Sequence, residues 1–143
     1  AKIGQQEKGC LVFTAHSLPA GDDAVLYQKQ YRQAVQGVSL RFPGFKIRIA
    51  YQSRGMGKGT WLGPAIEDVL AGLAQEGEKE VLVVPIGFVS DHVETLYDLD
   101  IKLKEHADSL NLKFQRCPAL NDSTLFIKAL TSVVHQLGDG MIS

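Results

Sequence analysis

Ionisable side chains follow one strongly apolar run of this sequence at short range. The run VLVVPI occupies 81–86. Four polar or ionisable residues come within the next eight positions: Ser90, Asp91, His92 and Glu94. Neutral imidazole and carboxylate groups are ligands for divalent first-row metals, and they are also the usual proton carriers near neutral pH. The cluster therefore indicates metal binding or acid–base chemistry.

Spacing within this cluster limits which side chains can act together. His92 and Glu94 are two positions apart at the start of an expected helix, so they point in different directions unless the first turn is irregular. Glu94 and Asp98 are four apart and share a helix face, which makes them the better-supported acidic pair. Two histidines and a carboxylate could form the facial triad of non-haem iron enzymes, but the spacing argues against one ion binding both His92 and Glu94.

The hydrophobic period alternates between strand-like and helix-like segments along the chain. Short apolar or alternating runs predict strands at 10–15, 46–52, 80–86 and 112–116. Apolar residues at helical spacing, with capping and breaking residues at the ends, predict helices at 22–42, 64–76, 92–110 and 122–137. Four strand-then-helix units in succession predict an α/β fold, a four-stranded parallel sheet in a doubly wound three-layer α/β/α sandwich.

In such a sheet the functional residues lie at one edge, because ligands of open parallel sheets bind beyond the carboxyl ends of the strands. The first predicted strand is followed by His16, the second by Arg54 and Trp61, and the third by the cluster at 90–94. We therefore expect three separate segments to bring histidine, carboxylate and an aromatic side chain together.

Length and composition exclude several classes of protein. A chain of 143 residues with 45% hydrophobic content is enough for one core. We expect a polar segment or linker at 1–9, one domain at 10–137 and a flexible tail at 138–143. Fifteen basic and sixteen acidic residues without a basic run argue against nucleic acid as a partner. Apolar runs of strand length and two distant cysteines predict a cytoplasmic protein without a transmembrane segment.

Several strings resemble one enzyme family in order and separation. They are AHSLP at 15–19, WLGP at 61–64, VPIGFVSDHVETLYDLD at 84–100, and RCPALN at 116–121 followed by FI and a leucine. Together they resemble the C-terminal half of ferrochelatases, which insert ferrous iron into a porphyrin during haem synthesis. The similarity extends over about residues 10–137 and implies the chelatase fold.

The resemblance implies a role for each matching residue. His16 matches the family's active-site histidine, either as iron ligand or as acceptor of pyrrole protons, and Glu94 matches the glutamate that faces it across the porphyrin pocket. His92 matches the histidine that supports this glutamate, and Trp61 matches an aromatic that lines the pocket. Asp98 matches the next member of an acidic row proposed to pass metal or protons, and Ser90 belongs to the same motif as a supporting residue.

The resemblance also implies the reactants and partners. Fe²⁺ is expected as substrate with protoporphyrin IX or coproporphyrin III, without an organic cofactor. The end of the chain, GDGMIS, lacks the cysteines for the iron–sulfur cluster of some ferrochelatases. Because the family's N-terminal half is missing, the expected partners are that half or a second copy in a homodimer. We expect the isolated domain to have little or no activity.

Two positions depart from the family pattern. Lys102 stands where relatives carry a further acidic residue one turn beyond Asp98, which weakens a metal relay. Asp23 replaces the proline of the common GDPY string, so the contacts of that loop are open.

Simpler roles and other functions compete with this interpretation. Alone, His16 would more often be a hydrogen-bonded loop residue, Glu94 a dipole-compensating carboxylate and Trp61 a core residue. Asp91 is a predicted helix N-cap. The loop GMGKGT at 55–60 could bind phosphate in a nucleotide-binding module, although the match to known motifs is poor. A dimeric chelatase of the sirohydrochlorin or cobalt type is the other alternative.

Overall fold

The computed structural model describes residues 9–141 and contains a four-stranded sheet with helices on both sides. The strands are β1 (Cys10–His16), β2 (Lys46–Gln52), β3 (Glu80–Val84) and β4 (Lys113–Arg116). The helices are α1 (Asp23–Ser39), α2 (Ile66–Gln75), the π-helix η1 (Thr95–Leu103), α3 (Lys104–Ser109) and α4 (Thr124–Met141).

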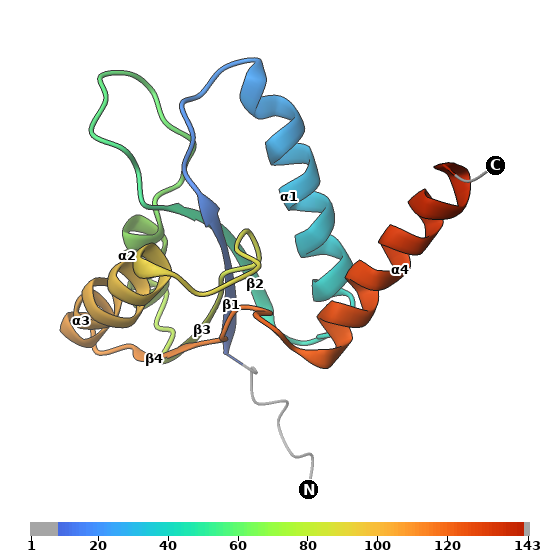
Figure 1. Ribbon diagram of the computed structural model, residues 1–143. Coiled ribbons are helices and arrows are strands. Elements are labelled where there is room, and N and C mark those ends of the chain that lie inside the picture. The colour runs from blue at the N-terminus through green and yellow to red at the C-terminus, as the bar shows by residue number, and fades with distance from the viewer. Residues whose placement is uncertain (1–8, 142–143) are drawn as a thin grey trace, which may run out of the picture.

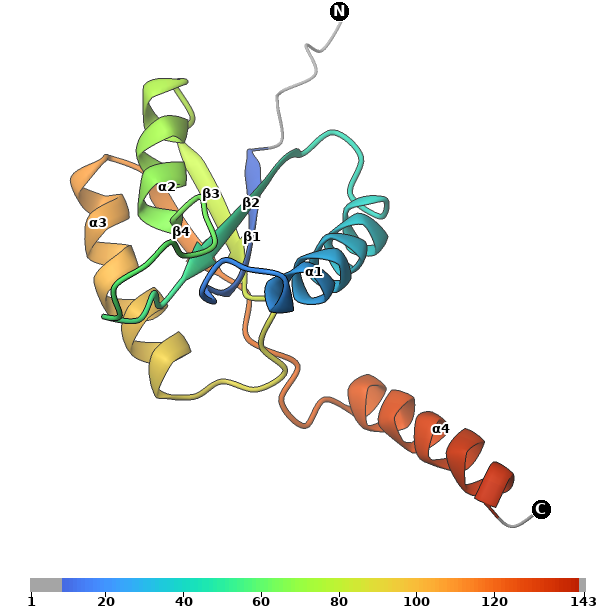
Figure 2. The ribbon, with the colours of Figure 1, turned by 90° about the horizontal axis from the view of Figure 1, so that it is seen from above.

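The sheet is parallel throughout, in the order β2-β1-β3-β4. Figures 1 and 2 show α1 on one face and α2, η1 and α3 on the other, with α4 extending away from the sheet on the side of α1. The order places β1 and β3 in the centre, so the segments that follow these two strands emerge beside each other at the carboxyl edge. The predicted doubly wound α/β class is confirmed.

Alternating strand residues divide the interior into two cores. Val12, Val81 and Val83 pack with α2, η1 and α3, whereas Leu11 and Phe13 pack with α1. This alternation is the consequence of a strand whose successive side chains point to opposite faces.

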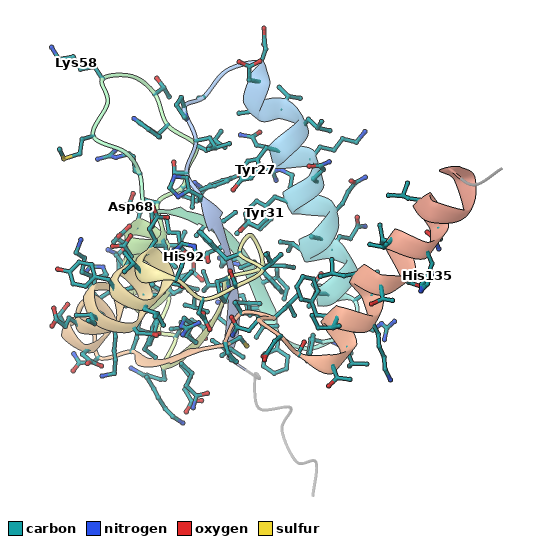
Figure 3. The ribbon with its side chains drawn as sticks, in the orientation of Figure 1. Tyr27, Tyr31, Lys58, Asp68, His92 and His135 are labelled. Carbon is teal, nitrogen blue, oxygen red and sulfur yellow. The ribbon has the colours of Figure 1, made fainter. Side chains whose placement is uncertain are left out.

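Helix α1 is attached to its face of the sheet by a buried tyrosine. The hydroxyl of Tyr31 lies 2.7 Å from the Phe13 carbonyl oxygen and 3.0 Å from that of Ala50. Figure 3 shows Tyr31 and Tyr27 reaching from α1 toward the strands. This attachment keeps α1 against β1, which carries His16 at its end.

Most predicted elements lie within a few residues of their observed bounds, and three differences matter. The helix predicted at 92–110 is divided, because Thr95–Leu103 is a π-helix and the α-helix Lys104–Ser109 follows it. The third strand ends at Val84, before the predicted 86. Helix α4 continues to Met141, into the segment expected as a tail, whereas 1–8 of the expected linker and 142–143 lie outside the described residues.

Within 9–141, none of the helices combines the length and apolar character that a membrane crossing requires.

Candidate active site

His16 and Glu94 meet at the carboxyl edge of the sheet. His16 is the last residue of β1, and Glu94 directly precedes η1, which follows β3. The His16 Nδ1 and Glu94 Oε2 atoms lie 3.4 Å apart. Both side chains are partly accessible, 34% and 46%, so a reactant can reach them from solvent. The site therefore offers one imidazole and one carboxylate side by side.

Their proximity differs from the expected placement on opposite sides of a porphyrin. A flat ring with a group in van der Waals contact on each face needs about 7 Å between those groups. At 3.4 Å, the His16 imidazole and the Glu94 carboxylate instead face a reactant from the same side. The distance is close to the roughly 3.3 Å that separates N and O ligands at adjacent positions of a tetrahedral ion with metal–ligand bonds of about 2.0–2.1 Å.

His92 supports the backbone that carries Glu94. Its Nδ1 atom accepts the backbone N–H of Glu94 at 3.2 Å, and its ring contacts Phe88 with centroids 5.3 Å apart. The backbone N–H of His92 donates to the Thr95 hydroxyl at 2.9 Å. These contacts hold the turn at the start of η1 and place the His92 ring against the backbone of Glu94.

The segment after Glu94 is the π-helix η1, where the sequence predicted an ordinary α-helix. Its i→i+5 hydrogen bonds widen the turn relative to an α-helix, and such segments are frequent at functional sites. Thr95, Leu99 and Leu103 are its buried positions. Glu94, directly before η1, is exposed and Asp98 is half-buried, so neither side chain belongs to the buried face of the π-helix.

Arg116 ties this segment to the sheet and was missed from the sequence. Its guanidinium donates to both Asp100 carboxylate oxygens at 2.5 and 2.8 Å and to the Asp91 Oδ1 atom at 2.8 Å. Only 11% of its side chain is accessible. Because Asp91 precedes Glu94 and Asp100 lies in η1, one side chain on β4 holds both sides of the Glu94 turn. The only signal in the sequence was the string RCPALN.

Asp91 is therefore not the helix cap that the sequence predicted. Its carboxylate accepts the Asn121 side-chain amide at 3.0 Å and the Arg116 guanidinium, and η1 has no side-chain cap. Hydrogen bonding from Asn121, together with the Ala119 amide and the charge of Arg116, lowers the pKa of Asp91. The residue links the Glu94 turn to the segment after β4.

The lowered pKa gives a pH-dependent prediction for Asp91→Asn. A carboxyl whose pKa is depressed in the folded state stabilises above its unfolded pKa, and this contribution is lost as the pH falls through the folded value. We expect the variant to be less stable than the parent by about 1 kcal/mol at pH 7, since water competes for this partly accessible carboxylate. The difference should shrink below about pH 4. Urea unfolding at both pH values measures it, and a constant difference would contradict the ion-pair origin.

A recess of about 770 Å³ lies next to the pair and has a polar, charged lining. Trp61, Asp98, Arg54 and Lys102 line it together with the start of α2. His16 and Glu94 are not among its lining residues, although the structure describes both. The expected site residues therefore form two neighbouring groups, the exposed pair and the recess.

Asp98 is already paired within this recess. It accepts the Ser53 hydroxyl at 2.6 Å, and its Oδ1 atom lies 3.5 Å from the Lys102 ammonium. Lys102 also lies over the Tyr97 ring, 4.7 Å from its centroid. The departure seen in the sequence at Lys102 thus places a positive charge beside the predicted relay residue.

Trp61 is half-buried and lies against the glycine-rich loop, so it lines the recess and is not a core residue. Its indole N–H donates to the Gly57 carbonyl at 3.2 Å. The ring passes so close to Gly55 that a Cβ there would lie 2.6 Å from Trp61 Cη2. Glycine at 55 therefore permits the observed ring position.

Gly55→Ala is expected to move the ring. Displacing it toward solvent should shift the fluorescence of Trp61, the single tryptophan of the chain, to the red and cost about 1 kcal/mol of stability. Gly57→Ala is the matched control, because its Cβ would make an ordinary 3.5 Å contact with the same ring. Unchanged emission from Gly55→Ala would contradict this packing.

The glycine-rich loop does not adopt the arrangement of a phosphate site. In such sites the loop leads directly into a helix whose N-terminal amides bind the anion. Here α2 begins at Ile66, six residues beyond the motif at 55–60. Figure 3 shows Lys58 at the tip of the loop, far from the sheet. The alternative of a nucleotide-binding module has no structural support at this loop.

Ser90 lies exposed in the loop before Asp91. Among residues 9–141, no three His, Cys, Asp or Glu side chains gather closely enough to hold a metal ion. The facial triad considered from the sequence is therefore not formed by the described residues. His16 and Glu94 remain the pair that the fold brings together.

Comparison with known proteins identifies sequence relatives and a similar fold. The family model described as Ferrochelatase matches residues 1–137. The ferrochelatase of Geotalea daltonii is 41% identical over 144 residues, which cover 98% of this chain and 45% of that protein. The ferrochelatase of Desulfotalea psychrophila is 44% identical over 133 residues, covering 90% of this chain and 40% of that protein. The chain thus spans about half the length of the curated relatives it matches.

A solved structure has the same fold at low identity. It is a putative cobalamin biosynthesis CbiX protein from Marinobacter aquaeolei, with a TM-score of 0.65 and 12% identity. The match covers 90% of this chain and 96% of that chain, so a single unit of this fold makes up nearly all of it. At this identity the likeness concerns the fold alone.

Proposed function

The chain belongs to the ferrochelatase family, and from this membership and the site geometry we propose that it is the C-terminal catalytic half of a chelatase that inserts Fe²⁺ into a porphyrin. The observation that supports this proposal most directly is the distance of 3.4 Å between His16 Nδ1 and Glu94 Oε2 at the carboxyl edge of the sheet. A neutral imidazole and a carboxylate at this distance suit a divalent ion in transit or two protons in turn.

The reaction requires groups of this kind. Inserting Fe²⁺ removes the protons of two pyrrole N–H groups and binds the ion to all four ring nitrogens, while the ion loses its water ligands. His16 and Glu94, on one side of the macrocycle, accept the two protons or hold the incoming ion while water leaves. His92 positions Glu94 through its backbone, and Arg116 fixes the turn from the other side.

The pair is open to solvent, so a complete porphyrin pocket needs a second wall. In the longer relatives the part that this chain does not span is the natural source of that wall. Protoporphyrin IX and coproporphyrin III are both candidate substrates, because they share the pyrrole nitrogens and differ only at two ring substituents, which are vinyl groups in the first and propionates in the second. Asp98 serves to hold Ser53 and Lys102 and does not act as a free relay carboxylate.

A chimera tests the proposal. The matching segment of the Geotalea daltonii ferrochelatase is replaced by this chain, and metal insertion is followed by porphyrin absorbance. We expect metallation within about tenfold of the parent rate. A correctly folded chimera that binds porphyrin but inserts neither Fe²⁺ nor Zn²⁺ would contradict the proposal. Thermal stabilisation of the isolated chain by ATP, NAD or FMN would favour the nucleotide alternative.

A chelatase of the cobalt type is the second candidate. It is favoured by the CbiX protein, whose fold is similar and whose length this chain nearly matches. Offering the chimera and the isolated chain Co²⁺ with sirohydrochlorin, in parallel with Fe²⁺ and porphyrin, separates the two. Turnover by the isolated chain on sirohydrochlorin alone would make this candidate the correct one.

A further inference from the structure

His16 lies where β1 has lost its pairing with one of its two neighbouring strands. The register of β1 with β3 ends at Phe13 and Val84, whereas the register of β1 with β2 continues to His16 and Gln52. Backbone N–H and C=O groups at the rim of a core need hydrogen-bond partners, because leaving them unpaired costs free energy. The last residues of β1 must therefore find partners outside β3.

The peptide that joins His16 to Ser17 is bonded at both of its polar groups. Its N–H, which belongs to Ser17, donates to the Gln52 carbonyl oxygen of β2 at 2.8 Å. Its carbonyl oxygen, which belongs to His16, accepts the hydroxyl of Tyr27 at 2.9 Å. Tyr27 lies on α1, is half-buried and reaches toward the end of β1 (Figure 3). A side chain of α1 thus takes the place of a strand partner at the residue that carries the imidazole.

Tyr31, one turn further along α1, makes a contact of the same kind at a different place. Its hydroxyl lies within hydrogen-bond distance of the carbonyl oxygens of Ala50 and of Phe13, three residues before His16. Tyr31 is only 5% exposed, so its contact is the more deeply buried of the two. The Tyr31 hydroxyl attaches α1 to the middle of the sheet, whereas the Tyr27 hydroxyl acts on His16 itself.

We propose that Tyr27 is a positioning residue for His16, and that its hydroxyl holds the peptide after His16 so that the imidazole stays beside the Glu94 carboxylate. The inference rests on the proposed function, in which these two side chains, 3.4 Å apart, act on the same reactant. Tyr27 touches the backbone of His16 and needs no contact with the metal or the porphyrin. Its role is to fix where the imidazole lies.

The effect of this hydrogen bond should appear in the chemical step. Without the Tyr27 hydroxyl, the peptide after His16 keeps its bond to Gln52 and loses the bond at its carbonyl oxygen, so it can rotate. Rotation of this peptide moves the adjoining Cα of His16 and, with it, the imidazole. A displacement of about 1 Å at a reacting group can lower a rate by roughly 100-fold. Porphyrin affinity, which depends on the pocket as a whole, should change little.

Matched tyrosine variants of the chimera test this role. Tyr27→Phe and Tyr31→Phe each remove one hydroxyl from α1 and keep the ring. For Tyr27→Phe we expect a kcat of metallation at least about tenfold lower, with a porphyrin KM within about twofold of the parent. For Tyr31→Phe we expect the larger fall in the midpoint of urea unfolding, because its hydroxyl is more deeply buried, but a kcat within about twofold. An unchanged kcat in Tyr27→Phe, or kcat losses that follow the losses of stability in the two variants, would overturn the proposal.

A measurement on the chain without any reaction separates this proposal from the proposed function. The ring signals of His16 in ¹H–¹⁵N NMR spectra at about pH 8, assigned with His16→Ala, report the surroundings of the imidazole. Tyr27→Phe should shift these signals, whereas Tyr31→Phe should leave them in place, and the ring signals of His106 should stay unchanged in both variants. An inactive parent chimera would contradict the proposed function, and the NMR comparison would still decide the role of Tyr27. His16 signals that do not move in Tyr27→Phe, or that move equally in Tyr31→Phe, would overturn it.

Discussion

His16→Ala is expected to reduce metal insertion by the chimera at least 100-fold while leaving its fold intact. General acid–base groups typically contribute factors of about 10² to 10⁴, and His16 is one of two such groups that the fold brings together. The side chain is partly accessible, so removing it creates no buried cavity. Initial rates of porphyrin metallation with Fe²⁺, and with Zn²⁺ as a redox-stable substitute, measure the effect.

The matched control is His106→Ala. His106 is a histidine on α3 whose Nε2 atom lies 3.3 Å from the Glu67 carbonyl oxygen, and it does not contact the pair. Its removal should change the rate less than twofold. If His16→Ala retained near-parental rates, or if both histidine variants lost activity equally, the assignment of the site to His16 would be wrong.

Arg116→Met is expected to destabilise the chain by about 2–4 kcal/mol. Removing one partner of a largely buried ion pair leaves the others uncompensated, here Asp91 and Asp100, at a cost of about 3–5 kcal/mol for full burial. The accessible fraction of Asp100, 37%, reduces this cost. The midpoint of urea unfolding measures the loss. In the chimera the same change should lower kcat by a larger factor than it changes KM, because it disorders the turn that carries Glu94.

A surface pair on the same strand provides the comparison. Lys113 on β4 lies 2.8 Å from Glu80, with both side chains more than 60% exposed. Such pairs contribute about 0–1 kcal/mol, so Lys113→Met should leave stability nearly unchanged. Adding Asp100→Asn to Arg116→Met should recover part of the loss. Equal losses of stability from Lys113→Met and Arg116→Met, or no recovery of stability with Asp100→Asn, would contradict this role of Arg116.

The sequence was sufficient for the fold because its periodicity is strong. The alternation of KIRIAYQ matched β2 residue for residue, and the strand predicted at 80–86 matched β3 except for its last two residues. The edge at which His16 and Glu94 meet followed from topology alone. Neither inference required knowledge of how individual side chains pack.

The finer features depended on tertiary contacts that no local pattern encodes. The π-helix at Thr95–Leu103 has the composition of an ordinary helix, so its wider turn was not predicted. Asp91 was taken for a cap because caps are local, whereas its observed partners lie 25 and 30 positions away. The outward course of α4 was not predicted either, because an amphipathic pattern shows that a helix has an apolar face but not which surface that face packs against.

The central claim is that Glu94 acts in the chemical step and not in holding the porphyrin. Glu94→Gln in the chimera tests it most directly, by measuring porphyrin affinity and single-turnover metallation on the same sample. We predict an affinity within about threefold of the parent and a metallation rate at least 100-fold lower, because the amide can neither accept a pyrrole proton nor offer an anionic ligand. Metallation at the parental rate, or loss of porphyrin binding together with activity, would contradict the account.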